Sequence, residues 1–264
     1  MRRNLLAVVA LSAALAVGVA AIASAASTTL RVGNLIFTVG GNAIPSTMPK
    51  NKYAPVKAQF FGKIRTSDGT HPSALRETVV TIDKDVKLNV KGLPVCKAGQ
   101  LQARDTKSAK RVCGKATIGT GKATAEIAFA EQRPIKVPSP ILVFNAGGNA
   151  KKIKLLIHTF ITVPVPAAIV TDVTVLKKGT GIHATARVPR IVGGAGSAID
   201  YQLTVGRSYR YKGKKTAYSM AKCPDGKFRA ATPKTVFKNE TNEPGVAAQT
   251  ILKGSILVPC KGRG

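Results

Sequence analysis

This chain of 264 residues carries 41 Lys and Arg against 12 Asp and Glu, and 44% of its residues are hydrophobic. That apolar fraction excludes a disordered chain, because it suffices for a buried core, and the lack of a Gly-triplet or heptad repeat excludes collagen and coiled coils. Beyond the N-terminal segment, no apolar run reaches the ~18 residues that a membrane-spanning helix needs.

Residues 1–25 have the pattern of an export signal. Arg2 and Arg3 form a positive n-region, an apolar stretch follows, and Ala23-Ser24-Ala25 is a small-x-small cleavage site. An uncleaved membrane anchor is the alternative, since the apolar stretch is just long enough to span a bilayer. The arginine pair also hints at a twin-arginine signal, although its flanking residues match that motif poorly. Cleavage removes two of the 29 net positive charges and leaves +27, and we expect a secreted or cell-envelope associated protein without a transmembrane span.

Short β-branched runs separated by turn residues fill the rest of the chain. In 80–90 the even positions are apolar except Lys84 and the odd positions are polar, which is typical of a strand with one solvated face. Further strands are predicted at 30–39, 56–65, 116–129, 141–144, 153–163, 169–176, 182–188, 199–211 and 251–258. Helical periodicity is scarce, and only 98–109 has room for a turn or two. The pattern predicts an all-β fold, an antiparallel β-sandwich (Ig-like or jelly-roll-like) or a barrel-like body.

Two domain arrangements are compatible with this pattern. The Pro-containing stretch 133–140 is typical of a semi-rigid connector, which would divide the chain into a lead-in with the first strand (26–52), a first β lobe (53–135) and a second β lobe (141–264). An edge-strand crossover at the same place would instead leave 53–264 as one large sandwich. No internal repeat relates the two halves.

Four cysteines in an exported chain predict disulfides. Three pairings are possible, and loop-closure entropy favours the sequence-local one, Cys96–Cys113 and Cys223–Cys260. A structural zinc site is the competing interpretation, but it needs close pairs such as Cys-x2-Cys, which the sequence lacks.

Several strings in the chain are similar to one known family. They are Gly92-Leu93-Pro94-Val95-Cys96, Cys113 followed by Ala116-Thr117-Ile118-Gly119-Thr120-Gly121, Phe144-Asn145, and Cys223-Pro224-Asp225-Gly226-Lys227-Phe228. Together they resemble an uncharacterised family of exported, disulfide-bonded β proteins from high-GC Gram-positive bacteria. The resemblance extends over most of 26–264 and implies no activity.

Catalytic and metal-binding patterns are weak. His71, His158 and His183 show no metal-ligand spacing, and no Gly-x-Ser-x-Gly elbow is present. We interpret His71 as a solvated turn residue and the other two as sheet residues. The glycines around Lys122 lack the spacing of a phosphate loop. We therefore predict no catalytic residue, metal or cofactor.

The sequence also contains a close pair of carboxylates. Asp83 and Asp85 would share one face of the 80–90 strand, and paired carboxylates can hydrolyse glycosides. The neighbouring Lys84 and Lys87 favour a solvated sheet face instead.

The positive charge carries the functional hypothesis. It concentrates at 107–111, 151–154 and 207–215, and in the last segment Lys212-Gly213-Lys214 is predicted to turn a hairpin. Cations and tyrosines there can bind a polyanion or stack on a ring, although lysines also simply protect sheet edges. The candidate polyanion-binding residues are Arg207, Tyr209, Arg210, Tyr211, Lys212, Lys214 and Lys215.

The resulting expectation is a non-enzymatic binding or structural module attracted to anionic envelope polymers or lipids. The alternatives are an extracellular hydrolase with a non-obvious active site and a non-specific binder of extracellular nucleic acid.

Overall fold

A computed structural model describes residues 26–129, 132–179 and 181–264. The predicted export signal, 1–25, lies outside the described residues. Strands make up 62% of the structure and helices 7%, which confirms the all-β prediction. No helix in the described ranges combines the length and the apolarity needed to cross a membrane.

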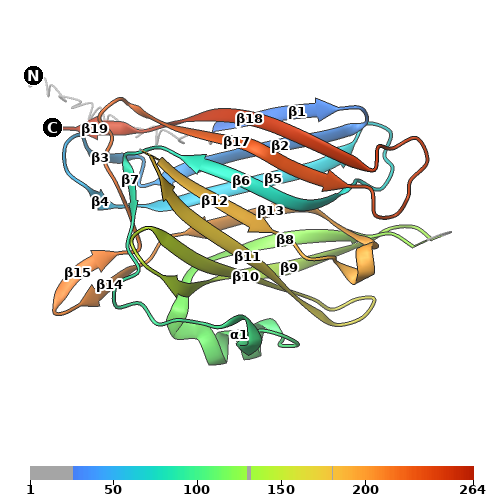
Figure 1. Cartoon of the computed structure of the whole chain (residues 1–264), viewed down its shortest axis with the longest axis horizontal. Coiled ribbons are helices and arrows are strands. Elements are labelled where there is room, and N and C mark those ends of the chain that lie inside the picture. The colour runs from blue at the N-terminus through green and yellow to red at the C-terminus, as the bar shows by residue number, and fades with distance from the viewer. Residues whose placement is uncertain (1–25, 130–131, 180) are drawn as a thin grey trace, which may run out of the picture.

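One antiparallel sheet of twelve strands forms most of the molecule (Figure 1). In spatial order its strands are β1 (Ala26–Val32), β2 (Leu35–Ile44), β5 (Lys57–Thr66), β13 (Gly196–Val205), β8 (Thr117–Ile127), β9 (Ile135–Gly148), β10 (Lys152–Ile161), β11 (Ala167–Lys178), β12 (Gly181–Arg187), β6 (Ala74–Ile82), β17 (Lys227–Lys238) and β18 (Gln249–Pro259). The edge strands β1 and β18 lie against each other, with Leu30 packed where a side chain on Gly254 would project. The sheet is therefore nearly barrel-shaped, and a two-sheet sandwich is not confirmed.

Strand alternation gives the sheet an inner and an outer face. On β10, Leu155, Ile157 and Ile161 face the interior, whereas Leu156 packs outward beneath a helical layer. Both faces of this strand are buried, which explains why its sequence is almost continuously apolar.

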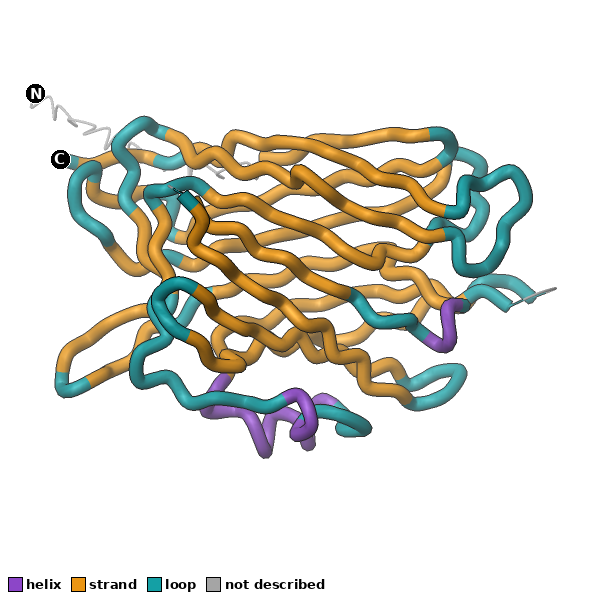
Figure 2. The backbone as a smooth tube through the Cα atoms, viewed as in Figure 1, coloured by secondary structure: helices purple, strands orange, loops and turns teal. Residues whose placement is uncertain are grey.

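The helical layer comprises residues 96–116, with α1 (Thr106–Cys113) between the 3-10 turns Ala98–Gln100 and Gly114–Ala116, and it lies outside the barrel-shaped sheet (Figure 2). Asp105 caps α1 by accepting a hydrogen bond from the Ser108 N–H at 2.6 Å. The Cys96–Cys113 disulfide ties the layer together.

The short strands outside the large sheet form three small sheets at one end of it, which we call the basic end (Figure 1). They are the pair β3 (Thr47–Pro49) and β19 (Lys261–Arg263), the three-stranded sheet β4 (Ala54–Pro55), β16 (Ser219–Ala221) and β7 (Val86–Leu88), and the hairpin β14 (Ser208–Tyr211) and β15 (Lys214–Ala217). The second disulfide, Cys223–Cys260, is buried here beside Met48 and Phe228. Both disulfides match the predicted pairing.

The structure corrects three local predictions. Segment 80–90 is not one strand, because β6 ends at Ile82 and the Asp83 carboxylate accepts the Asp85 N–H, which makes a turn before β7. Segment 133–140 is no connector, since most of it forms the start of β9, paired in register with β8. The lead-in 26–52 contains β1, β2 and β3 rather than one strand. In the large sheet, β13 lies between β5 and β8, and β6 between β12 and β17, so strands from both halves of the chain are neighbours.

Candidate functional site

The predicted basic hairpin forms, and it projects from the basic end (Figure 1). β14 pairs with β15 through a two-residue turn in which Lys212 and Gly213 both have positive φ, 49° and 75°. This is the geometry that two-residue hairpins favour and that glycine permits. Arg210, Lys212, Lys214 and Lys215 are exposed.

The other predicted site residues hold the hairpin in place. The Arg207 guanidinium donates to the carbonyls of Lys115 and Thr117, at 2.6 and 3.0 Å. The Tyr209 hydroxyl donates to the Lys91 carbonyl at 2.8 Å, and the Tyr211 ring occupies the space beside Gly92 that a side chain there would need. These contacts leave the exposed lysines and Arg210 as the groups that can meet a ligand.

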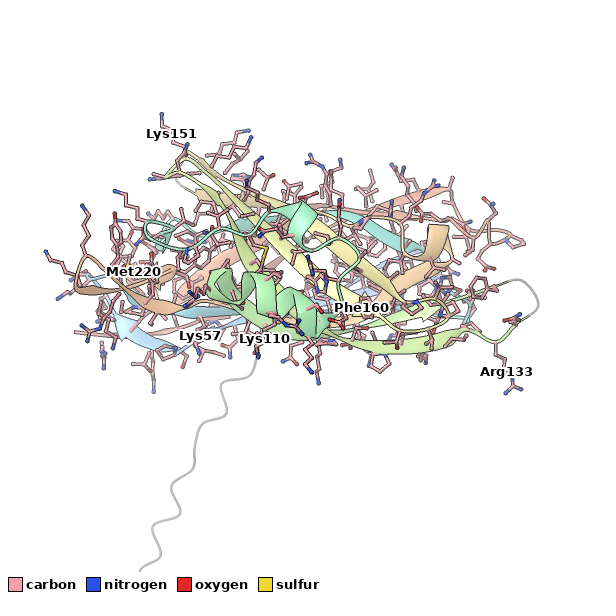
Figure 3. The ribbon with its side chains drawn as sticks, turned by 90° about the horizontal axis from the view of Figure 1, so that it is seen from below. Lys57, Lys110, Arg133, Lys151, Phe160 and Met220 are labelled. Carbon is pink, nitrogen blue, oxygen red and sulfur yellow. A yellow bond between two sulfur atoms is a disulfide. The ribbon has the colours of Figure 1, made fainter. Side chains whose placement is uncertain are left out.

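The hairpin belongs to a wider cluster of cations. Lys57 and Lys151 lie toward the same end of the molecule as Met220, whereas Arg133 lies at the opposite end (Figure 3). The exposed cations of the basic end are Lys50, Lys52, Lys57, Lys84, Lys87, Lys91, Lys151, Lys152, Lys177, Lys178, Arg210, Lys212, Lys214, Lys215, Lys227, Lys261 and Arg263.

Few carboxylates neutralise this cluster. The stretches of chain that carry these cations also contain Asp83, Asp85 and Asp225. Two of these carboxylates already interact with neighbouring groups. Asp85 is buried and pairs with the Lys222 ammonium at 3.2 Å, and Asp83 accepts the Arg229 N–H at 3.1 Å.

Carboxylates elsewhere in the fold also pair with nearby cations. Glu240 pairs with Arg76 and Arg190, and the hydrogen bond from Lys234 holds the pKa of Glu77 below its usual value. Arg2 and Arg3 aside, the chain has 39 Lys and Arg, and only five of them lie within 4.0 Å of a carboxylate of the described residues. Most of the positive charge is therefore free to attract an anion.

The large sheet surrounds an apolar cavity of about 340 Å³ that is partly open to solvent and that we call the interior cavity. Its walls come from the inward side chains of the large sheet, among them Ile141, Ile157, Val173 and Leu203. Alanines at other inward positions leave it unfilled: Ala123, Ala184, Ala186, Ala198 and Ala230. Small-molecule sites range from roughly 300 to 1,000 Å³, so this volume is sufficient for a ligand.

The surface of the interior cavity is mostly apolar, although residues with polar side chains, such as Thr78, Thr159 and Thr171, also line it. The Ser139 side chain is 5% exposed, and its Oγ has no hydrogen-bond partner among the described residues. The rings of Tyr201 and Tyr218 also line the cavity. Burial raises the pKa of both phenols well above the ordinary value, with no hydrogen bond contributing. Among the described residues that line the cavity, only Lys57 has a charged side chain, and it is exposed.

Closed unfilled core volume destabilises a protein by about 24 cal/mol per Å³. The interior cavity is partly open to solvent, and its walls are mostly apolar. A ligand that covers these walls would remove apolar surface from water, which is favourable.

His71 forms a Ser–His–Glu chain with two residues that the sequence did not indicate, Ser197 and Glu126. His71 Nδ1 lies 3.0 Å from Glu126 Oε1, and His71 Nε2 lies 3.1 Å from Ser197 Oγ. His71, expected to be solvated, is 8% exposed. No sequence motif joins these residues, which are 55 and 126 positions from His71.

The distances match those of a nucleophilic triad, but a substrate has no access to the serine hydroxyl. Ser197 is 1% exposed, and its hydroxyl donates to the Pro72 carbonyl at 2.6 Å. Neither the interior cavity nor the shallow pocket beside β1 and β18 includes Ser197. The chain of hydrogen bonds therefore fastens the loop around His71 to the sheet.

His158 is buried beneath the helical layer. Its Nε2 bonds the Arg104 carbonyl at 2.9 Å, which requires a proton on Nε2, and its Nδ1 has no partner among the described residues. Burial lowers the pKa of His158, which favours the neutral form of the imidazole in the fold.

Within the described ranges, no three His, Cys, Asp or Glu side chains come together as metal ligands would. No family model, curated protein or solved structure matches this chain.

Proposed function

We propose that this protein is an exported, non-enzymatic binding module that attaches to anionic polymers of the cell envelope through its basic end. The observation that carries the proposal is the concentration of exposed cations there, with only Asp83, Asp85 and Asp225 in the same segments. Two disulfides support a location outside the cytoplasm, where such bonds persist.

Recognition at the basic end depends on charge more than on stacking. The hairpin tip presents Arg210, Lys212, Lys214 and Lys215, while Tyr209 is tied to a backbone carbonyl and Tyr211 packs beside Gly92. A flexible phosphate- or carboxylate-bearing polymer satisfies such a cluster without a precise geometry. The binding should weaken steeply with salt, as for other polyanion complexes.

The test compares two triple variants with the same change in net charge. One carries Lys212→Glu, Lys214→Glu and Lys215→Glu in the hairpin, and the control carries three matched charge reversals at the opposite end. The control positions are Arg31, Arg65 and Lys136, which are also exposed. Each protein is co-sedimented with purified cell wall, before and after removal of its anionic polymers, across a salt series.

We expect capture of the unsubstituted protein to need the anionic polymers and to collapse with salt. The hairpin variant should lose at least tenfold more affinity than the control variant. Equal losses would show that net charge, not the basic end, drives binding. No capture at low salt would refute the proposal. Displacement by double-stranded DNA at lower concentration than by the wall polymer would favour the nucleic-acid alternative.

We do not propose hydrolysis. The Ser197–His71–Glu126 chain is the arrangement that such an activity would need, but the Ser197 hydroxyl is enclosed and bonded to the Pro72 carbonyl.

A further inference from the structure

We propose that the interior cavity binds one uncharged, single-chain lipid. This goes beyond the proposed attachment to polymers, because it concerns the inside of the sheet rather than its basic end. It rests on three features: a cavity of about 340 Å³, walls that are almost entirely apolar, and a buried Ser139 hydroxyl without a partner.

The volume sets the size of the occupant. A water molecule takes up about 30 Å³ in the liquid, and a methylene group is of similar size. The interior cavity therefore has room for a chain of about ten to twelve carbons. Its walls extend along the strands from Val258, at the basic end of β18, to Ile161, at the far end of β10. An elongated chain fits a space bounded in this way.

The walls also determine the charge of the occupant. Ile141, Ile157, Val173 and Leu203 offer no partner for an ion, and a buried charge without a partner is strongly disfavoured. Lys57, the one charged residue in the part of the lining that the structure describes, is exposed to solvent. An uncharged molecule is therefore favoured over a fatty acid anion.

Hydroxyl groups on the cavity wall can form hydrogen bonds with one polar group of the lipid. Strand register places Ser139 opposite Ala123 and Ala123 opposite Tyr201, so the three lie in one row across β9, β8 and β13. Tyr201 in turn lies across from Gly62, whose missing side chain makes room for the phenol ring. The Ser139 and Tyr201 hydroxyls can both donate and accept. A ligand hydroxyl, ester or carbonyl would give Ser139 the hydrogen bond that it lacks.

The test measures binding of an uncharged apolar dye, N-phenyl-1-naphthylamine, and its displacement by 1-dodecanol. Ala184→Leu places a larger side chain in the interior cavity. Thr185→Leu is the matched control, because Thr185 is the next residue of β12, pairs with Thr174 and Val79, and does not line the cavity. Circular dichroism and thermal unfolding verify that each variant is folded, and Ala186→Leu replaces Ala184→Leu if the latter fails to fold.

We expect the unsubstituted protein to bind about one dye molecule, and 1-dodecanol to displace it. Ala184→Leu should weaken dye binding at least tenfold, and Thr185→Leu should change it less than twofold. Ser139→Ala should weaken 1-dodecanol about fivefold, the effect of one hydrogen bond, without changing dye binding.

Three results would overturn the proposal. They are no saturable dye binding, equal effects of the two leucine substitutions, and tighter binding of dodecanoate than of 1-dodecanol. Because none of these measurements involves cell wall, their outcome is independent of the polymer proposal.

Discussion

Replacing Ala184 with leucine should stabilise the ligand-free protein, whereas enlarging a core residue normally destabilises by about 1–3 kcal/mol. Leucine adds three carbons, and each buried methylene contributes about 0.8 kcal/mol. Fixing the leucine side chain costs about 0.5–1 kcal/mol, which leaves a gain of about 1.5 kcal/mol. The change in the free energy of unfolding is therefore expected to be a gain rather than a loss, because Ala184 borders about 340 Å³ of unfilled space. For a chain of this size the gain corresponds to a Tm increase of about 3–6 °C.

Urea unfolding of ligand-free protein, followed by circular dichroism and tyrosine fluorescence, measures this effect. The chain has no tryptophan, so tyrosine is the intrinsic probe. Ala116→Leu is the control, since Ala116 is 2% exposed and packs in the cluster that joins the helical layer to Phe144 and Leu156 of the sheet. It should destabilise by the usual amount. Destabilisation by Ala184→Leu as large as that by Ala116→Leu would show that the interior is already packed and would refute the cavity argument.

Two further predictions concern buried groups outside the interior cavity. The pKa of His158 is lowered by burial, so the unfolded chain binds more protons below the ordinary pKa of about 6.5 and stability is lost as pH falls through that value. Between pH 7.5 and 5.5 the loss should reach at most about 1.4 kcal/mol by urea unfolding, and a His158→Leu variant that keeps the same pH dependence would contradict this. A fluorophosphonate probe should leave Ser197 unlabelled in the folded protein, because its hydroxyl is enclosed and bonded to Pro72. Mass-spectrometric detection of an adduct at Ser197 would instead revive the hydrolase alternative.

The sequence predicted those features that depend on residues close together in the chain. The Lys212-Gly213 turn follows from glycine's tolerance of positive φ, and the strands flanking it form as expected. Cys96–Cys113 and Cys223–Cys260 pair as loop closure favours, over separations of 17 and 37 residues. The all-β class follows from the same short β-branched runs.

Long-range features escaped prediction for a physical reason. The row of Ser139, Ala123 and Tyr201 exists only because β13 inserts beside β8, a pairing between segments about eighty residues apart that no local pattern encodes. His71 was expected to be solvated because it precedes Pro72 in a polar loop. That loop folds onto Glu126 and Ser197, which removes the imidazole from solvent.

The same alternation that builds the sheet keeps the two proposed activities apart. On β12, Ala184 and Ala186 face the interior cavity and Thr185 faces outward, so each strand contributes separately to an apolar inside and a polar outside. A net charge of +29 therefore coexists with 44% hydrophobic residues, and the one charged residue among the described residues that line the cavity, Lys57, is exposed. A substitution at the hairpin tip, such as Lys214→Glu, changes the potential at the basic end and leaves the cavity walls untouched. Ala184→Leu alters the cavity and no surface charge. We therefore expect each substitution to impair only one of the two proposed activities. Loss of both wall attachment and lipid binding in either variant would contradict this separation, because it would require contact between the lipid and the polymer.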